Sequence, residues 1–214
     1  MPLSLTAVRR LLIAIPIALS ALVVGGAGAQ PAPTRVLFIG NSLTFWNDGL
    51  WTHFERMNSQ AQPPVAVTTG RSVFPGAFFK SLWERPEPRE AIRSRRYDVV
   101  VLQEDLPETR IEDFRDHARR FVAEVRQAGA RPILLMAWAY PRLGWITMAE
   151  IARAHREHPS IYGTYLATAV VYATIFGTDP SPLTYSPAGM ATDDAAFLRR
   201  VAWEVALQSP PGSR

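Results

Sequence analysis

The chain of 214 residues contains no cysteine. This absence excludes disulfide bonds, thiolate metal sites and the lipid-modified cysteine of a lipoprotein. Histidine is also scarce, with four residues: His53, His117, His155 and His158. The last two are spaced at i and i+3, but no carboxylate motif accompanies them. We therefore predict neither a metal nor a cofactor.

A strong charge of one sign is missing as well. The full chain has a net charge of +4, and removal of the first 29 residues, which hold two of the 23 basic residues, leaves 21 − 19 = +2. The arginines of the segment 112–120 alternate with acidic residues, which is more typical of a solvated helix face than of a nucleic-acid-binding stripe. We expect no nucleic-acid partner.

The N-terminal segment has the order of a secretory leader. Arg9 and Arg10 precede the apolar run Leu11–Val24, which ends in the small residues Ala27-Gly28-Ala29. The run is shorter than the roughly 20 apolar residues of a membrane-spanning helix. We predict a signal peptide over 1–29, export to the periplasm or medium, and no stable membrane insertion after cleavage; retention of the leader as an anchor is the alternative.

The remaining 30–214 segment, 214 − 29 = 185 residues, is long enough for one domain with a sizeable core. Its apolar and turn patterns predict alternating strands and helices. The strands are expected at 35–39, 65–69, 98–103 and 132–138, and the main helices at 43–57, 109–128, 160–176 and 191–207. Such alternation predicts an α/β fold in three layers, with a parallel sheet of about four strands between helices. The sequence does not indicate an oligomeric state.

Ser42 follows the first expected strand in Val36–Thr44 (VLFIGNSLT) and precedes a helix. A serine on such a turn lies at the carboxyl edge of the sheet, beside the unpaired N–H groups of a helix start. A nucleophile with an oxyanion site can be built there. The alternative is that Ser42 only caps the helix, as serine often does.

Four pieces of sequence, in order, resemble the SGNH/GDSL hydrolases. The Val36–Thr44 segment is similar to the first block of the branch whose serine follows Gly-Asn, and Gly70 follows the second expected strand. The segment Tyr97–Glu104 (YDVVVLQE) resembles the third block, with glutamine in place of asparagine. His158-Pro159-Ser160, with the helix after it, resembles the histidine block.

This resemblance implies the three-layer, flavodoxin-like fold of the family and a role for each matched residue. Ser42 would be the nucleophile and His158 its general base. The oxyanion donors would be the backbone N–H groups of Ser42 and Gly70 and the side-chain amide of Gln103. The other two helical histidines, His53 and His117, are expected at a surface or interface with no role.

Two departures from the family pattern bear on activity. The family presents an aspartate three residues before the histidine, where this chain has His155. The family also carries a helix and a fifth strand in the region that is reduced here to Tyr140–Glu157, so an edge strand is expected to be missing. A Ser–His dyad without a carboxylate would be a weakened catalyst.

Two functions are therefore compatible with the sequence. The first is a secreted serine esterase that acts on acyl groups of carbohydrates or other small esters. The second is a degenerate member of the family that binds a glycan or small ligand without turnover. A third class, a phosphate binder of the flavodoxin type that uses the Gly40-Asn41-Ser42 turn, lacks the glycine-rich loop that such sites need.

Overall fold

The computed structural model describes residues 33–94, 96–104, 109–136 and 160–208. The contacts between residues separate the chain into two units, Met1–Pro31 and Ala32–Arg214. Every described element belongs to the second unit. The strands are β1 (Arg35–Gly40), β2 (Thr68–Val73), β3 (Val99–Glu104) and β4 (Arg131–Met136). The helices are α1 (Ser42–Phe45), α2 (Gly49–Ser59), α3 (Phe79–Glu84), α4 (Pro86–Arg93), α5 (Ile111–Gln127), α6 (Ile161–Phe176) and α7 (Thr192–Gln208).

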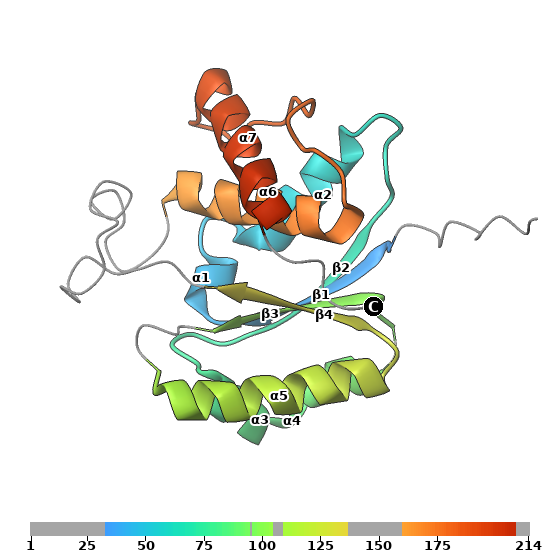
Figure 1. The fold of residues 1–214 in the computed structure, drawn as a ribbon, viewed down its shortest axis with the longest axis vertical. Coiled ribbons are helices and arrows are strands. Elements are labelled where there is room, and N and C mark those ends of the chain that lie inside the picture. Colours follow the sequence, from blue (N-terminus) through green and yellow to red (C-terminus); the bar gives the residue numbers. More distant parts are fainter. Residues whose placement is uncertain (1–32, 95, 105–108, 137–159, 209–214) are drawn as a thin grey trace, which may run out of the picture. The chain divides into compact units, whose positions relative to one another are not determined.

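The four strands form one parallel sheet in the order β2-β1-β3-β4. Helices α2, α6 and α7 lie on one side of the sheet, and α3, α4 and α5 lie on the other (Figure 1). The predicted three-layer α/β fold with about four parallel strands is thus confirmed. Because every strand runs in the same direction, all carboxyl ends meet at one edge, and α1 starts at that edge.

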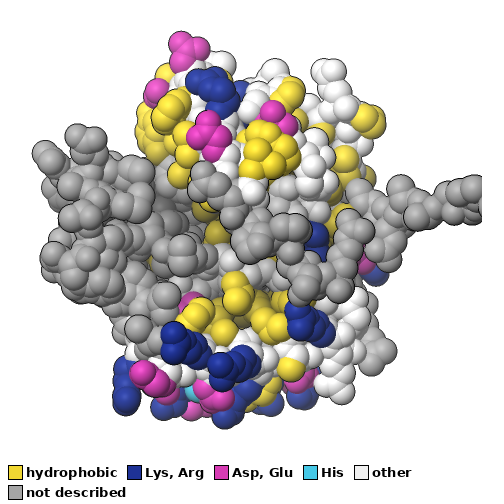
Figure 2. Space-filling model, viewed as in Figure 1, with side chains coloured by type: hydrophobic (Ala, Val, Ile, Leu, Met, Phe, Trp, Pro, Cys, Tyr) yellow, Lys and Arg dark blue, Asp and Glu magenta, His cyan; other side chains and the backbone are white. Residues whose placement is uncertain are grey.

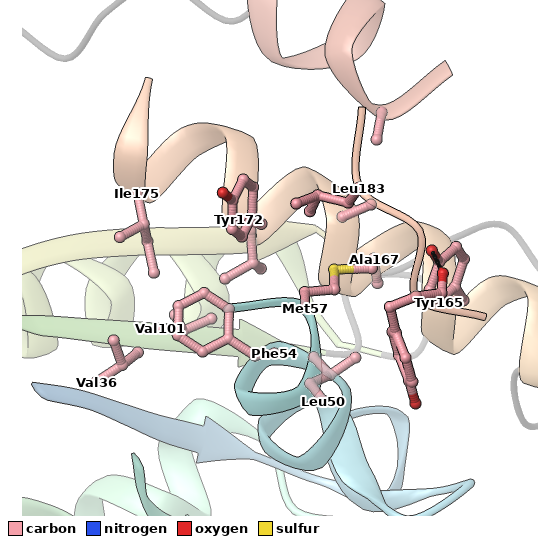
Figure 3. Close-up of a cluster of buried hydrophobic side chains, with 14 of the residues drawn as sticks. Val36, Leu50, Phe54, Met57, Val101, Tyr165, Ala167, Tyr172, Ile175 and Leu183 are labelled. Atoms are coloured by element: carbon pink, nitrogen blue, oxygen red, sulfur yellow. Dashed lines mark hydrogen bonds between the residues drawn. The ribbon is translucent and has the colours of Figure 1, made fainter. Parts of the chain in front are cut away.

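The central strand β3 is buried along its whole length, as its apolar run predicts. Its side chains alternate between the two cores: Val99 and Val101 face the core under α2 and α6, whereas Val100 and Leu102 face the core above α5. Figure 3 shows the first core, where Phe54 of α2 lies between the sheet and α6. The same alternation directs the two polar residues that end β3, Gln103 and Glu104, to opposite faces of the sheet.

The helix expected at 43–57 is divided into α1 and α2. Asn47, Asp48 and Gly49 all have positive φ, at 51°, 67° and 77°, and a helix cannot continue through left-handed residues. Pro86 and Pro88 lie in the first turn of α4. Proline at the first helical positions loses no hydrogen bond, because those N–H groups have no partner within the helix.

The outer surface of α5 carries charges of both signs in alternation (Figure 2). Arg120 and Asp116 form an i,i+4 ion pair across this surface at 2.7 Å. In the described part of the chain, no helix combines the length and apolar character needed to cross a bilayer.

Candidate active site

Ser42 is the first residue of α1, immediately beyond the carboxyl end of β1. The N-cap of α1 is Asn41, whose Oδ1 accepts a hydrogen bond from the N–H of Leu43 at 3.0 Å. The alternative that Ser42 caps the helix is therefore wrong. Ser42 is half-buried, and among the described residues its hydroxyl has no hydrogen-bond partner, so this hydroxyl is available for chemistry.

Gln103 ends β3 next to β1 and is 1% exposed. Its Oε1 accepts hydrogen bonds from the backbone N–H of Asn41 at 3.0 Å and from the hydroxyl of Thr44 at 2.9 Å. The orientation of the amide follows from the first bond, since a backbone N–H can only donate. The Nε2 group has no partner within the described residues. An unpaired buried donor costs about 1–3 kcal/mol, so a ligand acceptor here would gain a prepared hydrogen bond.

Gly40 makes this arrangement possible. A Cβ atom at residue 40 would lie 2.4 Å from Oγ1 of Thr44 and 2.7 Å from Oε1 of Gln103. Any larger residue would push these two side chains away from the start of α1. Each residue of the Gly-Asn-Ser turn thus has a separate role: Gly40 leaves room for the amide of Gln103, Asn41 caps the helix, and Ser42 carries a hydroxyl with no partner among the described residues.

The loop after β2 is hydrogen-bonded to the same edge of the sheet. Nδ2 of Asn41 donates to the carbonyl oxygen of Ala77 at 3.1 Å. From the other face of the sheet, Oε2 of Glu104 accepts from the N–H of Phe79 at 2.5 Å. The two contacts hold the loop beside the turn that carries Ser42.

Gly70 does not lie at this edge. It is inside β2, opposite Leu37, whereas Gly40 pairs with Val73. This offset of three residue positions corresponds to about 10 Å along a strand. A Cβ at residue 70 would lie 2.1 Å from the hydroxyl of Tyr97, so packing accounts for this glycine. The predicted position of Gly70 after its strand was wrong, because the polar edge strand β2 starts and ends three to four residues later than its apolar pattern suggested.

The loop after β2 contains another glycine, Gly76, which is exposed and which the sequence analysis did not single out. Gly76 follows Pro75 in a turn closed by the N–H of Ala77 on the carbonyl of Phe74, at 3.3 Å, and its φ is +61°. Among the described residues its own N–H has no acceptor, while the other N–H groups of the loop are paired, namely those of Phe74, Ala77, Phe78 and Phe79. The Pro-Gly pair after a strand was the available signal.

His158 and His155 lie outside the described residues. The next described residue is Ser160, which caps α6 by accepting from the N–H of Gly163 at 3.4 Å. The first turn of α6 contacts the turn behind α1, since Nδ2 of Asn47 donates to Oγ1 of Thr164 at 3.0 Å. The segment that contains His158 therefore precedes a helix whose first turn is hydrogen-bonded to the turn that follows α1.

His53 was expected at a surface or interface, but it is 1% exposed. Its Nε2 lies 2.8 Å from the carbonyl oxygen of Asn47, and its Nδ1 lies 2.8 Å from the hydroxyl of Tyr185. Burial lowers the pKa of His53, which favours the neutral ring. His117 is also buried and bonds to the carbonyl of Asp113 in its own helix. The described residues contain no group of three or more side chains suited to a metal ion.

No protein-family model matches the sequence, and no curated protein matches it. Solved structures do. A DUF4886 family protein from Bacteroides uniformis ATCC 8492 is 14% identical with a TM-score of 0.64, and the match covers 85% of this chain and 97% of that chain. The two chains share a fold.

Two further structures match with lower TM-scores. A protein assigned to the G-D-S-L family from Desulfitobacterium hafniense DCB-2 is 14% identical with a TM-score of 0.44, covering 80% of this chain and 99% of that chain. A catalytic mutant of Axe2, an acetylxylan esterase from Geobacillus stearothermophilus, is 14% identical with a TM-score of 0.44, covering 85% and 97%.

Proposed function

We propose that this protein is an exported serine esterase of the SGNH type, with Ser42 as nucleophile and His158 as general base. One observation carries the proposal. A free hydroxyl, Ser42, starts a helix at the carboxyl edge of the sheet, and the adjacent strand supplies a buried amide donor, Nε2 of Gln103, with no partner among the described residues. Nucleophile and oxyanion donor are the two groups that acyl transfer needs side by side.

In this mechanism His158 takes the proton of Ser42 while the hydroxyl oxygen attacks the ester carbonyl carbon. The carbonyl oxygen becomes negatively charged and accepts hydrogen bonds from Nε2 of Gln103 and the N–H of Ser42, with Gly76 as the candidate third donor. His158 then returns the proton to the leaving alcohol. Water repeats the sequence and releases the acid from the acyl-enzyme. The substrate is a small or carbohydrate-borne ester, and neither metal nor cofactor takes part.

His155 favours a second function, ligand binding without turnover. An imidazole in the place of the usual aspartate cannot stabilise the imidazolium that forms on His158. If the dyad acts alone, turnover is low for alkyl esters and measurable for aryl acetates, whose good leaving groups require less proton transfer.

Hydrolysis of an aryl acetate by the chain from Gln30 onward tests both functions. Ser42→Ala should remove all turnover above background, whereas the matched Ser94→Ala, on the remote helix end of α4, should not change it. Turnover that survives Ser42→Ala overturns the proposal. An inactive wild type that gains activity on His155→Asp identifies the degenerate binder.

Export is a separate part of the proposal and rests on the leader alone. N-terminal sequencing of protein recovered from the envelope or the medium should begin at Gln30. An intact leader on exported protein would support the anchor instead.

A further inference from the structure

The solvent-facing side of α1 carries the proposed nucleophile and two aromatic side chains. Residues three and four positions apart share one face of a helix, so Phe45 and Trp46 lie on the same face as Ser42. Burial agrees with this division, because Ser42 and Phe45 are half-buried and Trp46 is exposed. Leu43 and Thr44, between them, are buried. The N–H of Trp46 bonds to the carbonyl of Ser42 at 2.9 Å and continues the helical turn, so the two Cβ atoms are about 6 Å apart.

The indole of Trp46 is 45% exposed, whereas the other described tryptophans, Trp51, Trp83 and Trp203, are half-buried. An exposed indole offers a ligand a large, flat apolar face. The backbone of Trp46 is held from both sides, since its carbonyl also accepts from the N–H of Gly49 at 3.1 Å. A ring on a fixed backbone has only two side-chain torsions to order, so a contact with it costs little conformational entropy.

The proposed oxyanion donor determines the direction in which a substrate extends. Oε1 of Gln103 accepts from the N–H of Asn41 and the hydroxyl of Thr44, on the buried side of α1. An ester whose carbonyl oxygen accepts from Nε2 of Gln103 therefore directs that oxygen inward. Its larger substituent then extends outward, over the exposed face that Trp46 shares with Ser42.

The surroundings of the indole favour a sugar ring over an acyl chain. Asp48 is exposed and occupies the third position of the turn that begins at Trp46 and closes at Gly49. A pyranose can place its polarised C–H groups against the negative face of an indole and donate its hydroxyls to a carboxylate. An acyl chain gains only from apolar contacts, and its burial against a carboxylate would remove water from the charge.

We propose that Trp46 is a specificity-determining residue that stacks on the sugar ring of a carbohydrate-borne ester, beside Phe45 and within reach of Asp48. This inference rests on the proposed function and narrows its substrate to an esterified pyranoside. The sugar is the alcohol part of the ester, so the contact lies outside the bond that is broken.

Binding tests the contact without turnover. The ligand is a monoacetylated methyl xylopyranoside, and its dissociation constant is measured by NMR titration of the Ser42→Ala variant with and without Trp46→Ala. We expect Trp46→Ala to weaken binding by about 3–10-fold, the loss of one aromatic contact, and Trp46→Phe to weaken it less. Phe197→Ala in the same background is the matched control, since Phe197 is a 56% exposed aromatic residue on α7. This control should not change the affinity.

Kinetics of the chain from Gln30 connect the contact to the reaction. Trp46→Ala should raise KM for the sugar ester by a similar factor with kcat nearly unchanged, because a contact remote from the reacting bond is equally strong in the ground state and the transition state. Vinyl acetate has a good leaving group and no ring, so neither constant should change for it. Aryl acetates do not serve as this control, since their own ring can stack on the indole.

Three results would overturn the role of Trp46. The first is a sugar that does not bind, or that binds equally well with and without Trp46→Ala. The second is an equal loss on vinyl acetate, which would indicate damage to the α1 turn itself. The third is a loss that grows from nitrophenyl acetate to nitrophenyl octanoate, which would assign the indole to an acyl chain. A wild type that hydrolyses no ester, while its Ser42→Ala variant binds the sugar through Trp46, overturns the proposed turnover and leaves the stacking role intact.

Discussion

The two edges of the sheet differ in whether their polar side chains have hydrogen-bond partners. At the amino edge, the carboxylate of Asp98 accepts from the backbone N–H groups of Thr34 and Arg35, both at 3.0 Å, and from Nε of Arg35 at 3.1 Å. At the carboxyl edge, Nε2 of Gln103 has no partner among the described residues.

The unpaired group is also the less hydrated one. The Asp98 side chain is 28% exposed, whereas Gln103 is 1% exposed. An unsatisfied polar group costs most where water cannot reach it. The contacts of Asp98 therefore hold β1 and β3 together at the amino edge, whereas the carboxyl edge keeps an unpaired donor at some cost in stability.

Gln103→Glu should give the largest effect, because it replaces Nε2 of Gln103, the unpaired donor at the carboxyl edge. The carboxylate keeps an oxygen for Asn41 and Thr44 but replaces the N–H donor with a negative charge. Loss of one oxyanion donor typically lowers turnover by about 10²–10³. The reciprocal swap at the next position, Glu104→Gln, keeps one oxygen that can accept from the N–H of Phe79 on the other face of the sheet and should change aryl-acetate kcat far less. Equal losses in both variants would contradict a donor role for Gln103.

Gly40→Ala should come next, with a loss of about 1–3 kcal/mol in the free energy of unfolding from overpacking against Thr44 and Gln103. Because both side chains support the site, turnover per folded molecule should fall as well. Gly70→Ala is the matched control, since its Cβ would meet Tyr97 in a similar clash away from the edge. Denaturant titration and active-site-normalised kinetics measure the two effects. Loss of turnover in folded Gly70→Ala would restore Gly70 as an oxyanion donor.

Asp98→Asn should affect only stability, by about 1 kcal/mol at neutral pH. The hydrogen bond from Arg35 lowers the pKa of Asp98 below its usual value near 3.8. A lowered carboxyl pKa means that the stabilisation is present above the unfolded pKa and is lost as pH falls through the folded pKa. Unfolding curves of wild type and variant should differ at pH 7, and the difference should shrink as the pH falls below about 3.8 toward the lowered pKa of the folded state. A gap that widens on acidification would contradict this sign.

Arg71→Ala should give the smallest effect. The guanidinium of Arg71, on edge strand β2, lies 5.0 Å from the ring centre of Trp51 on α2. Exposed cation–π contacts contribute about 0.5–1 kcal/mol. Thermal unfolding should show this small loss, and aryl-acetate kinetics should not change. A marked loss of turnover would mean that the β2 edge also takes part in the site.

The sequence by itself determined the layers of the fold and the place of Ser42. The apolar runs of β1 and β3 predict central parallel strands because both faces of such strands are buried, and a strand that ends in Gly-Asn-Ser before a helix places the serine at the carboxyl edge. These features depend on local pattern and on the direction of the chain.

Only the tertiary structure decided which groups accompany Ser42. The ends of β2 depend on pairing with β1, so the sequence alone misplaced Gly70 and overlooked Gly76. The turn at Asn47 contacts Thr164 and His53, and the orientation of the Gln103 amide depends on Asn41 and Thr44. Each of these features depends on a contact between residues that are distant in the chain, or on a backbone conformation that most residues disfavour. Local propensity does not predict such contacts.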